Sequence, residues 1–135
     1  MPGVLEDKDA IREVLAEYCF ALDGNRFEDM AALFTEDGTW DTAFGAAKGR
    51  VAIAELARSL RERAGDSRPR AVHLVTNIAI ALDGDRAQVR SNWMVMQNSP
   101  DGPKIGSGGA YVDEMVRDGG HWRFGYRKID RFIAP

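Results

Sequence analysis

The sequence predicts a single α+β domain, with three amphipathic helices followed by a curved antiparallel sheet, folded around a pocket for a small organic molecule. In the first half of the chain, apolar residues recur three and four positions apart, as on one face of a helix. After Arg70 the pattern changes to the alternation that is typical of strands. A chain of 135 residues is an ordinary length for one domain, spanning 1–135, and is long enough to bury a substantial core.

Three helices are expected before residue 65. The first covers residues 9–23, with Asp7 or Asp9 as its capping residue, and ends at Gly24-Asn25, where left-handed geometry is tolerated. The second is short, at residues 27–34, and the third covers residues 51–63. Their apolar stripes consist of Ile11, Val14, Leu15, Tyr18 and Leu22, then Phe27, Met30, Ala31 and Phe34, then Ile53, Leu56, Ala57 and Leu60.

Four strands are expected after residue 70, preceded by an extended segment at residues 39–44. They cover residues 71–82, 87–97, 105–117 and 121–132, and turns rich in Gly, Asp and Pro separate them. Short turns between successive strands predict an antiparallel meander. The glycines of residues 106–109 lie within a strand and no helix follows them, so they are interpreted as a bend in the sheet and not as a phosphate loop.

The strand at residues 71–82 also predicts self-association. Strict alternation places Val72 and Leu74 on one face and Ala71, His73 and Asn77 on the other, and neither face is suited to water. Because three helices can cover only one side of a sheet, a second subunit is expected on the other. A homo-oligomer, either a dimer or a trimer, is therefore predicted.

Composition and charge limit the classes of partner and compartment. A net charge of −3 gives no reason to expect nucleic acid or a membrane as a partner. The basic segment 48–70 is interpreted as a solvated face that complements the acidic residues before it. Cys19 is the single cysteine, no apolar run of about 18 residues occurs, and no signal peptide is visible, so a cytoplasmic protein is expected.

Three polar residues are candidates for chemistry. His73 lies mid-strand among apolar neighbours, where it is either a core histidine bonded to backbone or a general base in a cavity. Asp23, at the end of the first helix, is either a turn residue or the carboxylate that orients His73. Tyr18 faces inward and either packs in the core or donates a hydrogen bond to a ligand.

Further residues suit a pocket wall or a core equally well: Trp40, Trp93, Met94, Tyr111 and Phe124. No hydrolase motif built on Ser/His/Asp or Cys/His occurs. His73 and His121 are expected to lie far apart, so no metal site is predicted.

The chain resembles the SnoaL-like branch of the nuclear transport factor 2-like superfamily over nearly its whole length. The segments that carry the resemblance are DAIREVLAEYCFALDGNRFEDMAALFTEDGTWD, GAAKGRVAIAEL, HLVTN with LDGDRA, and GGHWRFGYRKID. The resemblance implies a cone-shaped α+β barrel that encloses a pocket. It does not imply one reaction, because the superfamily includes isomerases, dehydratases, epoxide hydrolases, cyclases and proteins without known activity.

Within that superfamily the chain looks most like the scytalone dehydratase and hexachlorocyclohexane dehydrochlorinase group. The group's catalytic Asp and His correspond to Asp23 and His73. Tyr18 stands where the dehydrochlorinase has a cationic residue, Arg127 matches its arginine on the last strand, and Asn92 is the nearest substitute for the dehydratase's second histidine. These departures imply a generic β-elimination site and neither exact activity.

The last strand raises a question about Arg127. Trp122, Phe124 and Tyr126 have the opposite parity to Arg127, so one of the two sets is expected to face away from the pocket.

The function expected from these features is a cofactor-independent lyase of the dehydratase type, acting on a small, largely apolar, aromatic or polycyclic molecule. His73 would remove a proton, Asp23 would orient it, and Tyr18 and Arg127 would stabilise the departing oxygen or the enolate. The expected substrate-binding residues are Trp40, Asn77, Asn92, Met94 and Tyr111. The alternatives are a ketosteroid-type isomerase and a non-catalytic ligand-binding protein.

Overall fold

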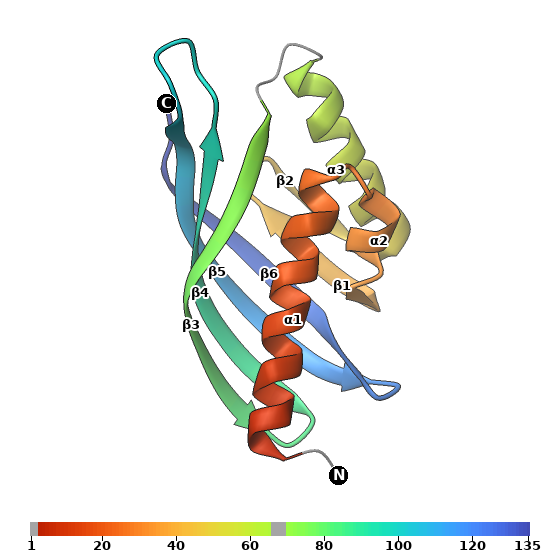
Figure 1. The fold of residues 1–135 in the computed structure, drawn as a ribbon. Coiled ribbons are helices and arrows are strands. Elements are labelled where there is room, and N and C mark those ends of the chain that lie inside the picture. The colour runs from red at the N-terminus through yellow and green to blue at the C-terminus, as the bar shows by residue number, and fades with distance from the viewer. Residues whose placement is uncertain (1–2, 66–69) are drawn as a thin grey trace.

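In the computed structural model, which describes residues 3–65 and 70–135, three helices pack on one face of a six-stranded sheet (Figure 1). The helices are α1 (Val4–Asp23), α2 (Phe27–Ala31) and α3 (Arg50–Ala64). The strands are β1 (Phe34–Thr42), β2 (Gly45–Lys48), β3 (Ala71–Asp83), β4 (Arg86–Gln97), β5 (Lys104–Asp118) and β6 (His121–Ile133). The predicted α+β class is confirmed.

The sheet is mixed and not wholly antiparallel. Its order is β2-β1-β6-β5-β4-β3, and the four strands from β3 to β6 form the predicted antiparallel meander. β1 pairs with β6 in parallel and with β2 in an antiparallel hairpin. The parallel pair was not predicted, because it joins segments about 90 residues apart and a local pattern carries no signal for such pairing.

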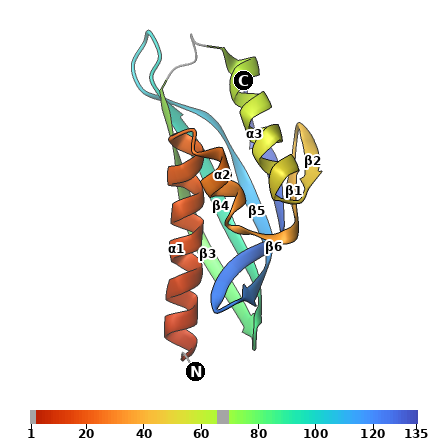
Figure 2. The ribbon, with the colours of Figure 1, turned by 90° about the vertical axis from the view of Figure 1, so that its right-hand side faces the viewer.

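The helices lie on the concave face of the sheet in two groups. Figure 2 shows α1 running alongside β3, while α3 lies beside β1 and β2. The core between these layers contains the predicted stripe residues Ile11, Leu15, Tyr18, Phe27, Met30, Phe34, Ile53 and Ala57. None of the described helices is long and apolar enough to cross a membrane.

The start of α1 differs from the prediction. The helix begins at Val4, so Asp7 lies inside it and is not a cap. The Asp7 carboxylate accepts hydrogen bonds from Trp122 Nε1 at 3.2 Å and from Arg117 Nη2 at 2.9 Å. The bond from Arg117 lowers the pKa of Asp7. These contacts fix the N-terminal end of α1 against β5 and β6.

Two irregularities interrupt the alternation of the strands. Asn77 has a φ of 56°, and the pairing of β3 with β4 shifts between Thr76 and Ala79. Residues after this bulge change face, so Ile78 and Ile80 pack against the core although they have the opposite parity to Val75. The predicted faces of residues 71–82 are therefore wrong after Thr76.

A second irregularity, at Gly125, resolves the question of the last strand. Glu114 pairs with Tyr126 while Met115 pairs with Phe124, so Gly125 is an extra residue in β6. Because of this bulge, Phe124 and Arg127 are both buried despite their opposite parity. The parity argument, which expected one of the two sets to face away from the pocket, therefore does not separate Phe124 from Arg127.

Arg127 forms a buried ion pair with Asp113. Both side chains are fully buried, and Arg127 Nε lies 3.2 Å from Asp113 Oδ1. The guanidinium carbon lies over the rings of Tyr111 at 3.5 Å, Tyr18 at 4.1 Å and Phe124 at 4.5 Å. Burial raises the pKa of Asp113 to about 6, and Arg127 opposes part of that rise.

Close backbone contact explains one glycine of the segment 106–109. The pairing of β5 with β6 shifts between Gly108 and Gly109, in agreement with the predicted bend. A Cβ atom on Gly109 would lie 1.9 Å from the Asp130 carbonyl oxygen. The same carbonyl accepts a hydrogen bond from Trp93 Nε1 at 3.1 Å, so Gly109 must be a glycine for this contact to form.

We expect Gly109→Ala to destabilise the protein by about 2–3 kcal/mol, because the new methyl group displaces backbone and not a flexible side chain. Thermal unfolding followed by circular dichroism measures this change. Gly125→Ala is the matched control, since its Cβ would be 3.5 Å from the nearest atom, an ordinary contact. Equal melting temperatures for the two variants would contradict the assigned role of Gly109.

The Asp113 carboxyl predicts a pH-dependent stability. Between pH about 4 and about 6 the folded protein holds a proton on Asp113 that the unfolded chain has lost. The free energy of unfolding should therefore fall by about 3 kcal/mol from this group as the pH rises through that window. Urea unfolding across pH 4–7 should show this loss in the wild type and in the exposed control Asp101→Asn, but not in Asp113→Asn. Parallel profiles for all three proteins would refute it.

Candidate functional site

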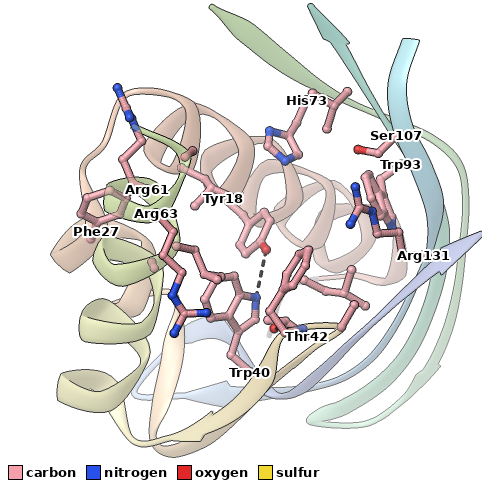
Figure 3. A pocket seen from close by; sticks show the side chains of 18 of the residues that line it. Tyr18, Phe27, Trp40, Thr42, Arg61, Arg63, His73, Trp93, Ser107 and Arg131 are labelled. Carbon is pink, nitrogen blue, oxygen red and sulfur yellow. Dashed lines mark hydrogen bonds between the residues drawn. The ribbon is translucent and has the colours of Figure 1, made fainter. Parts of the chain in front are cut away.

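A cavity of about 500 Å³ lies between the helices and the concave face of the sheet, and its size suits a drug-sized ligand (Figure 3). α1, α2, α3 and strands β1, β3, β4, β5 and β6 contribute to its walls. Most lining side chains are apolar or aromatic, including Leu22, Phe27, Trp40, Phe44, Leu60, Trp93, Val95, Tyr111 and Ile129. The predicted pocket is therefore present.

His73 and Asp23 are in direct contact at the edge of this cavity. His73 Nδ1 lies 2.5 Å from Asp23 Oδ1, and the backbone N–H of His73 donates to Asp23 Oδ2 at 2.9 Å. The two side chains are only 13% and 19% exposed. The carboxylate thus holds both the ring and the backbone of His73, and it does so from the last residue of α1.

This contact fixes the orientation of the imidazole. Because Asp23 accepts from Nδ1–H, the neutral ring carries its lone pair on Nε2. His73 lines the cavity, as Figure 3 shows, and both His73 and Asp23 line a second cavity of about 520 Å³ between α1 and β3. His73 is thus in contact with the cavity, whereas its carboxylate partner is not among the residues that line it.

Tyr18 and Trp40 form a second polar pair in the cavity. Trp40 Nε1 donates to the Tyr18 hydroxyl oxygen at 3.0 Å, and both residues line the cavity (Figure 3). Burial raises the pKa of Tyr18 to about 12, so the phenol stays protonated at neutral pH. Since the tyrosine oxygen accepts from Trp40, its own O–H is available to donate to a ligand oxygen.

Arg127 is not a cavity residue, which corrects the predicted direct role in stabilising a departing oxygen. Its guanidinium lies beneath Tyr18 and Tyr111, paired with Asp113. Among the residues that the structure describes, its three nitrogens find no hydrogen-bond partner of suitable geometry. Any effect of Arg127 on a ligand must therefore pass through the tyrosines that cover it.

Three of the five predicted substrate-binding residues lie outside the cavity. Trp40 and Tyr111 line it, but Asn77, Asn92 and Met94 do not. Asn77 is the exposed bulge residue of β3, which breaks the alternation that placed it beside His73. Asn92 and Met94 lie on the opposite face of β4 from Trp93, so they point to the outer side of the sheet.

Several residues that line the cavity were absent from the predicted substrate-binding set. Trp93 was considered as a wall residue but left out of the substrate-binding set, although it shares its face with Val95, the register partner of His73. Ser107 pairs with Val95 on the other side and so continues the same cross-strand row as His73. Because Ser107 lies within a glycine-rich bend, the sequence does not show that it shares a row with His73, and the strand register is needed to show it. Arg61, Arg63 and Arg131 also line the cavity and were not predicted.

The described side chains offer neither a reactive thiol nor a metal-binding group of residues. Burial raises the pKa of the Cys19 thiol to about 11, so it is protonated at neutral pH and poorly nucleophilic. In residues 3–65 and 70–135, no three His, Cys, Asp or Glu side chains are grouped as a metal site requires. The dyad of His73 and Asp23 is the arrangement on which a reaction can be built.

Comparison with known proteins identifies similar chains. An uncharacterized protein from Mycobacterium tuberculosis is 30% identical over 123 residues, which are 88% of this chain and 81% of that protein. A solved structure of a function-unknown protein from Mycobacterium tuberculosis superposes with a TM-score of 0.83 at 30% identity, covering 96% of this chain and 76% of that one.

Two solved structures from Novosphingobium aromaticivorans are also similar. One, described as an NTF2-like protein with a cystatin-like fold, has a TM-score of 0.81 at 28% identity and covers 93% of this chain and 81% of its own. The other, named "Putative Scytalone Dehydratase", has a TM-score of 0.79 at 27% identity and covers 96% of this chain and 86% of its own. The model of the SnoaL-like domain matches residues 3–128. With that match and the fold described above, the chain belongs to the SnoaL-like domain family and has the nuclear transport factor 2-like fold.

Proposed function

We propose that this protein is a cofactor-independent lyase that removes water from a small, largely apolar, aromatic or polycyclic molecule. One observation carries the proposal: the contact of 2.5 Å between His73 Nδ1 and Asp23 Oδ1 at the edge of an apolar cavity. A carboxylate partner on one ring nitrogen, at a position that lines a cavity, is the arrangement that a general base requires. The similar structure named as a scytalone dehydratase supports the same reaction class.

The proton transfer follows from the orientation of His73. Nε2 takes a proton from the carbon next to a carbonyl group, and Asp23 stabilises the imidazolium that forms. The electron pair of the broken C–H bond forms the C=C bond as the hydroxyl leaves the neighbouring carbon. The proton on Nε2 passes to that hydroxyl, water is released, and His73 returns to its neutral form.

Tyr18 stabilises the charge that develops during this step. Its O–H, free to donate because the oxygen accepts from Trp40, can bind the carbonyl oxygen as that oxygen becomes an enolate. Arg127 acts as a positioning residue, because its charge lies under the Tyr18 ring at 4.1 Å and strengthens the phenol as a donor. An isomerase would use the same base, and it differs in that its product keeps the oxygen.

The probe for this reaction is 3-hydroxy-1-tetralone, which becomes fluorescent 1-naphthol when it loses water. We expect His73→Ala to lower the rate of naphthol formation by about 10²–10⁴, because the general base is lost. Asp23→Asn should also lower the rate strongly, because an amide cannot stabilise the imidazolium or hold the same tautomer.

Asn92→Ala is the control for these variants, since Asn92 is exposed on the outer face of the sheet and should keep the wild-type rate. A folded His73→Ala protein that forms naphthol as fast as the wild type would refute the lyase proposal. Conversion of a β,γ-unsaturated ketone without loss of water would assign the same base to an isomerase.

We also propose that the protein is a homo-oligomer that associates through the outer face of the sheet. Val72, Met96 and Ile105 are neighbours in one cross-strand row, and their side chains are 49%, 39% and 55% exposed. Contiguous exposed apolar side chains of this kind are typical of a subunit interface.

Sedimentation velocity at micromolar concentration should show a dimer or a trimer. Met96→Asp should shift the protein toward monomer, because it places a charge in the middle of the apolar row. Sedimentation of the wild type as a monomer would contradict the predicted assembly.

A further inference from the structure

The charged side chains that line the cavity, among the residues that the structure describes, are all cationic. Arg61, Arg63 and Arg131 line it, and no Asp or Glu of residues 3–65 or 70–135 does, although the chain has 21 acidic residues and a net charge of −3. We infer that the ligand carries a carboxylate, which Arg63 and Arg131 bind at the mouth of the cavity while its ring system occupies the apolar interior. This inference rests on the proposed function for the site and names its substrate class as an aromatic or polycyclic acid.

Arg63 and Arg131 differ from Arg58 in that they form no ion pair with the described part of the fold. Arg58 on α3 pairs with Glu28 on α2, which agrees with the predicted complementary surfaces. Arg63 and Arg131, in contrast, form no ion pair with any of the residues described in the structure. Arg61 donates to the carbonyl oxygen of Gly65 at 3.0 Å, so part of its donor capacity is used at the end of α3.

Arg63 and Arg131 lie on opposite walls of the cavity. In Figure 3, Arg63 extends from α3 on the side of Trp40, and Arg131 lies on the sheet side next to Trp93. Arg131 also contacts the Phe44 ring at 5.2 Å. A carboxylate in this part of the cavity is attracted by both guanidinium groups, and each of them has the fork geometry that binds a carboxylate.

The sheet register gives the approximate span from the cations to the dyad. Val75, Trp93, Gly109 and Arg131 form one cross-strand row, and His73 lies two residues before Val75. Three strand intervals correspond to about 14 Å between the Cα atoms of β3 and β6. The curvature of the sheet and the length of the arginine side chain shorten this gap. A molecule that reaches both sites is longer than one aromatic ring.

The interior between these ends is suited to a flat ring system. Trp93 stacks on Tyr111 with ring centroids 5.9 Å apart, and Tyr18 meets Tyr111 edge-on at 5.8 Å. His73 lies 6.4 Å from Trp93. An aromatic ligand would contact this wall with its rings while its acidic group stays near water at the mouth, where desolvation costs little.

The test compares two ligands that differ only in charge, naphthalene-2-carboxylate and naphthalene-2-carboxamide. Calorimetric titration at low salt, checked by quenching of tryptophan fluorescence, gives the two dissociation constants. Because Arg63 and Arg131 are exposed, each pair is partly screened. We expect the carboxylate to bind about five- to tenfold more tightly, with most of this preference lost at 0.5 M salt.

Three variants locate the preference. Arg131→Gln and Arg63→Gln should each reduce it, and the double variant should bind acid and amide equally. Arg90→Gln removes the same charge from the outer side of β4, does not touch the cavity lining, and should keep the full preference. Equal binding of the two ligands by the wild type, no binding of the acid at millimolar concentration, or an unchanged preference in the double variant would each overturn the inference.

The same titration separates this inference from the proposed lyase activity. His73→Ala should still prefer the carboxylate, because binding at the mouth does not need the base. If no dehydration is found but the preference is present and depends on the two arginines, the anion site stands and the lyase proposal fails. If the dehydration of neutral 3-hydroxy-1-tetralone depends on His73 while the preference is absent, the reverse holds.

Discussion

The contact between Asp23 and His73 is the interaction on which the geometry of the site depends. One carboxylate binds both the backbone N–H and the ring Nδ1 of His73, and this joins the last residue of α1 to β3. At the other end of α1, Asp7 binds Arg117 and Trp122 of β5 and β6. The helix is thus attached to the sheet at both ends, by carboxylates 16 residues apart. The C-terminal part of α1, with Tyr18 and Leu22, forms one wall of the cavity.

Strand irregularities decide which side chains reach that cavity. The bulge at Asn77 leaves His73 and Val75 facing inward and returns Ile78 to the core. The bulge at Gly125 brings Arg127 inward after Phe124, under the floor made by the two tyrosines. A one-residue shift changes the face of every following side chain in the strand. The two bulges therefore change which side chains of β3 and β6 point inward.

The charged groups of the site lie at different depths, from the buried Arg127 to the arginines near the surface. The deepest cation, Arg127, is balanced by Asp113 and by aromatic faces, and it lies out of reach of a ligand. The dyad lies at the edge of the cavity, and its carboxylate is not among the residues that line it. Within the described part of the lining, no carboxylate lies beside the outer arginines. This order places a neutral base near the apolar interior and positive charge near water, where a charged group of a ligand loses little hydration.

The sequence by itself determined the class of fold, the helices, the four long strands and the pairing of Asp23 with His73, because these follow from local periodicity and from a resemblance along the whole chain. It did not determine that β1 joins β6 in parallel, that Asn77 and Met94 point away from the cavity, or that Arg131 points into it. Those features depend on strand register and on bulges, which are set by contacts between segments far apart in the chain. A strict alternation of faces is a property of one ideal strand, whereas the faces of a curved sheet are decided by all of its strands together.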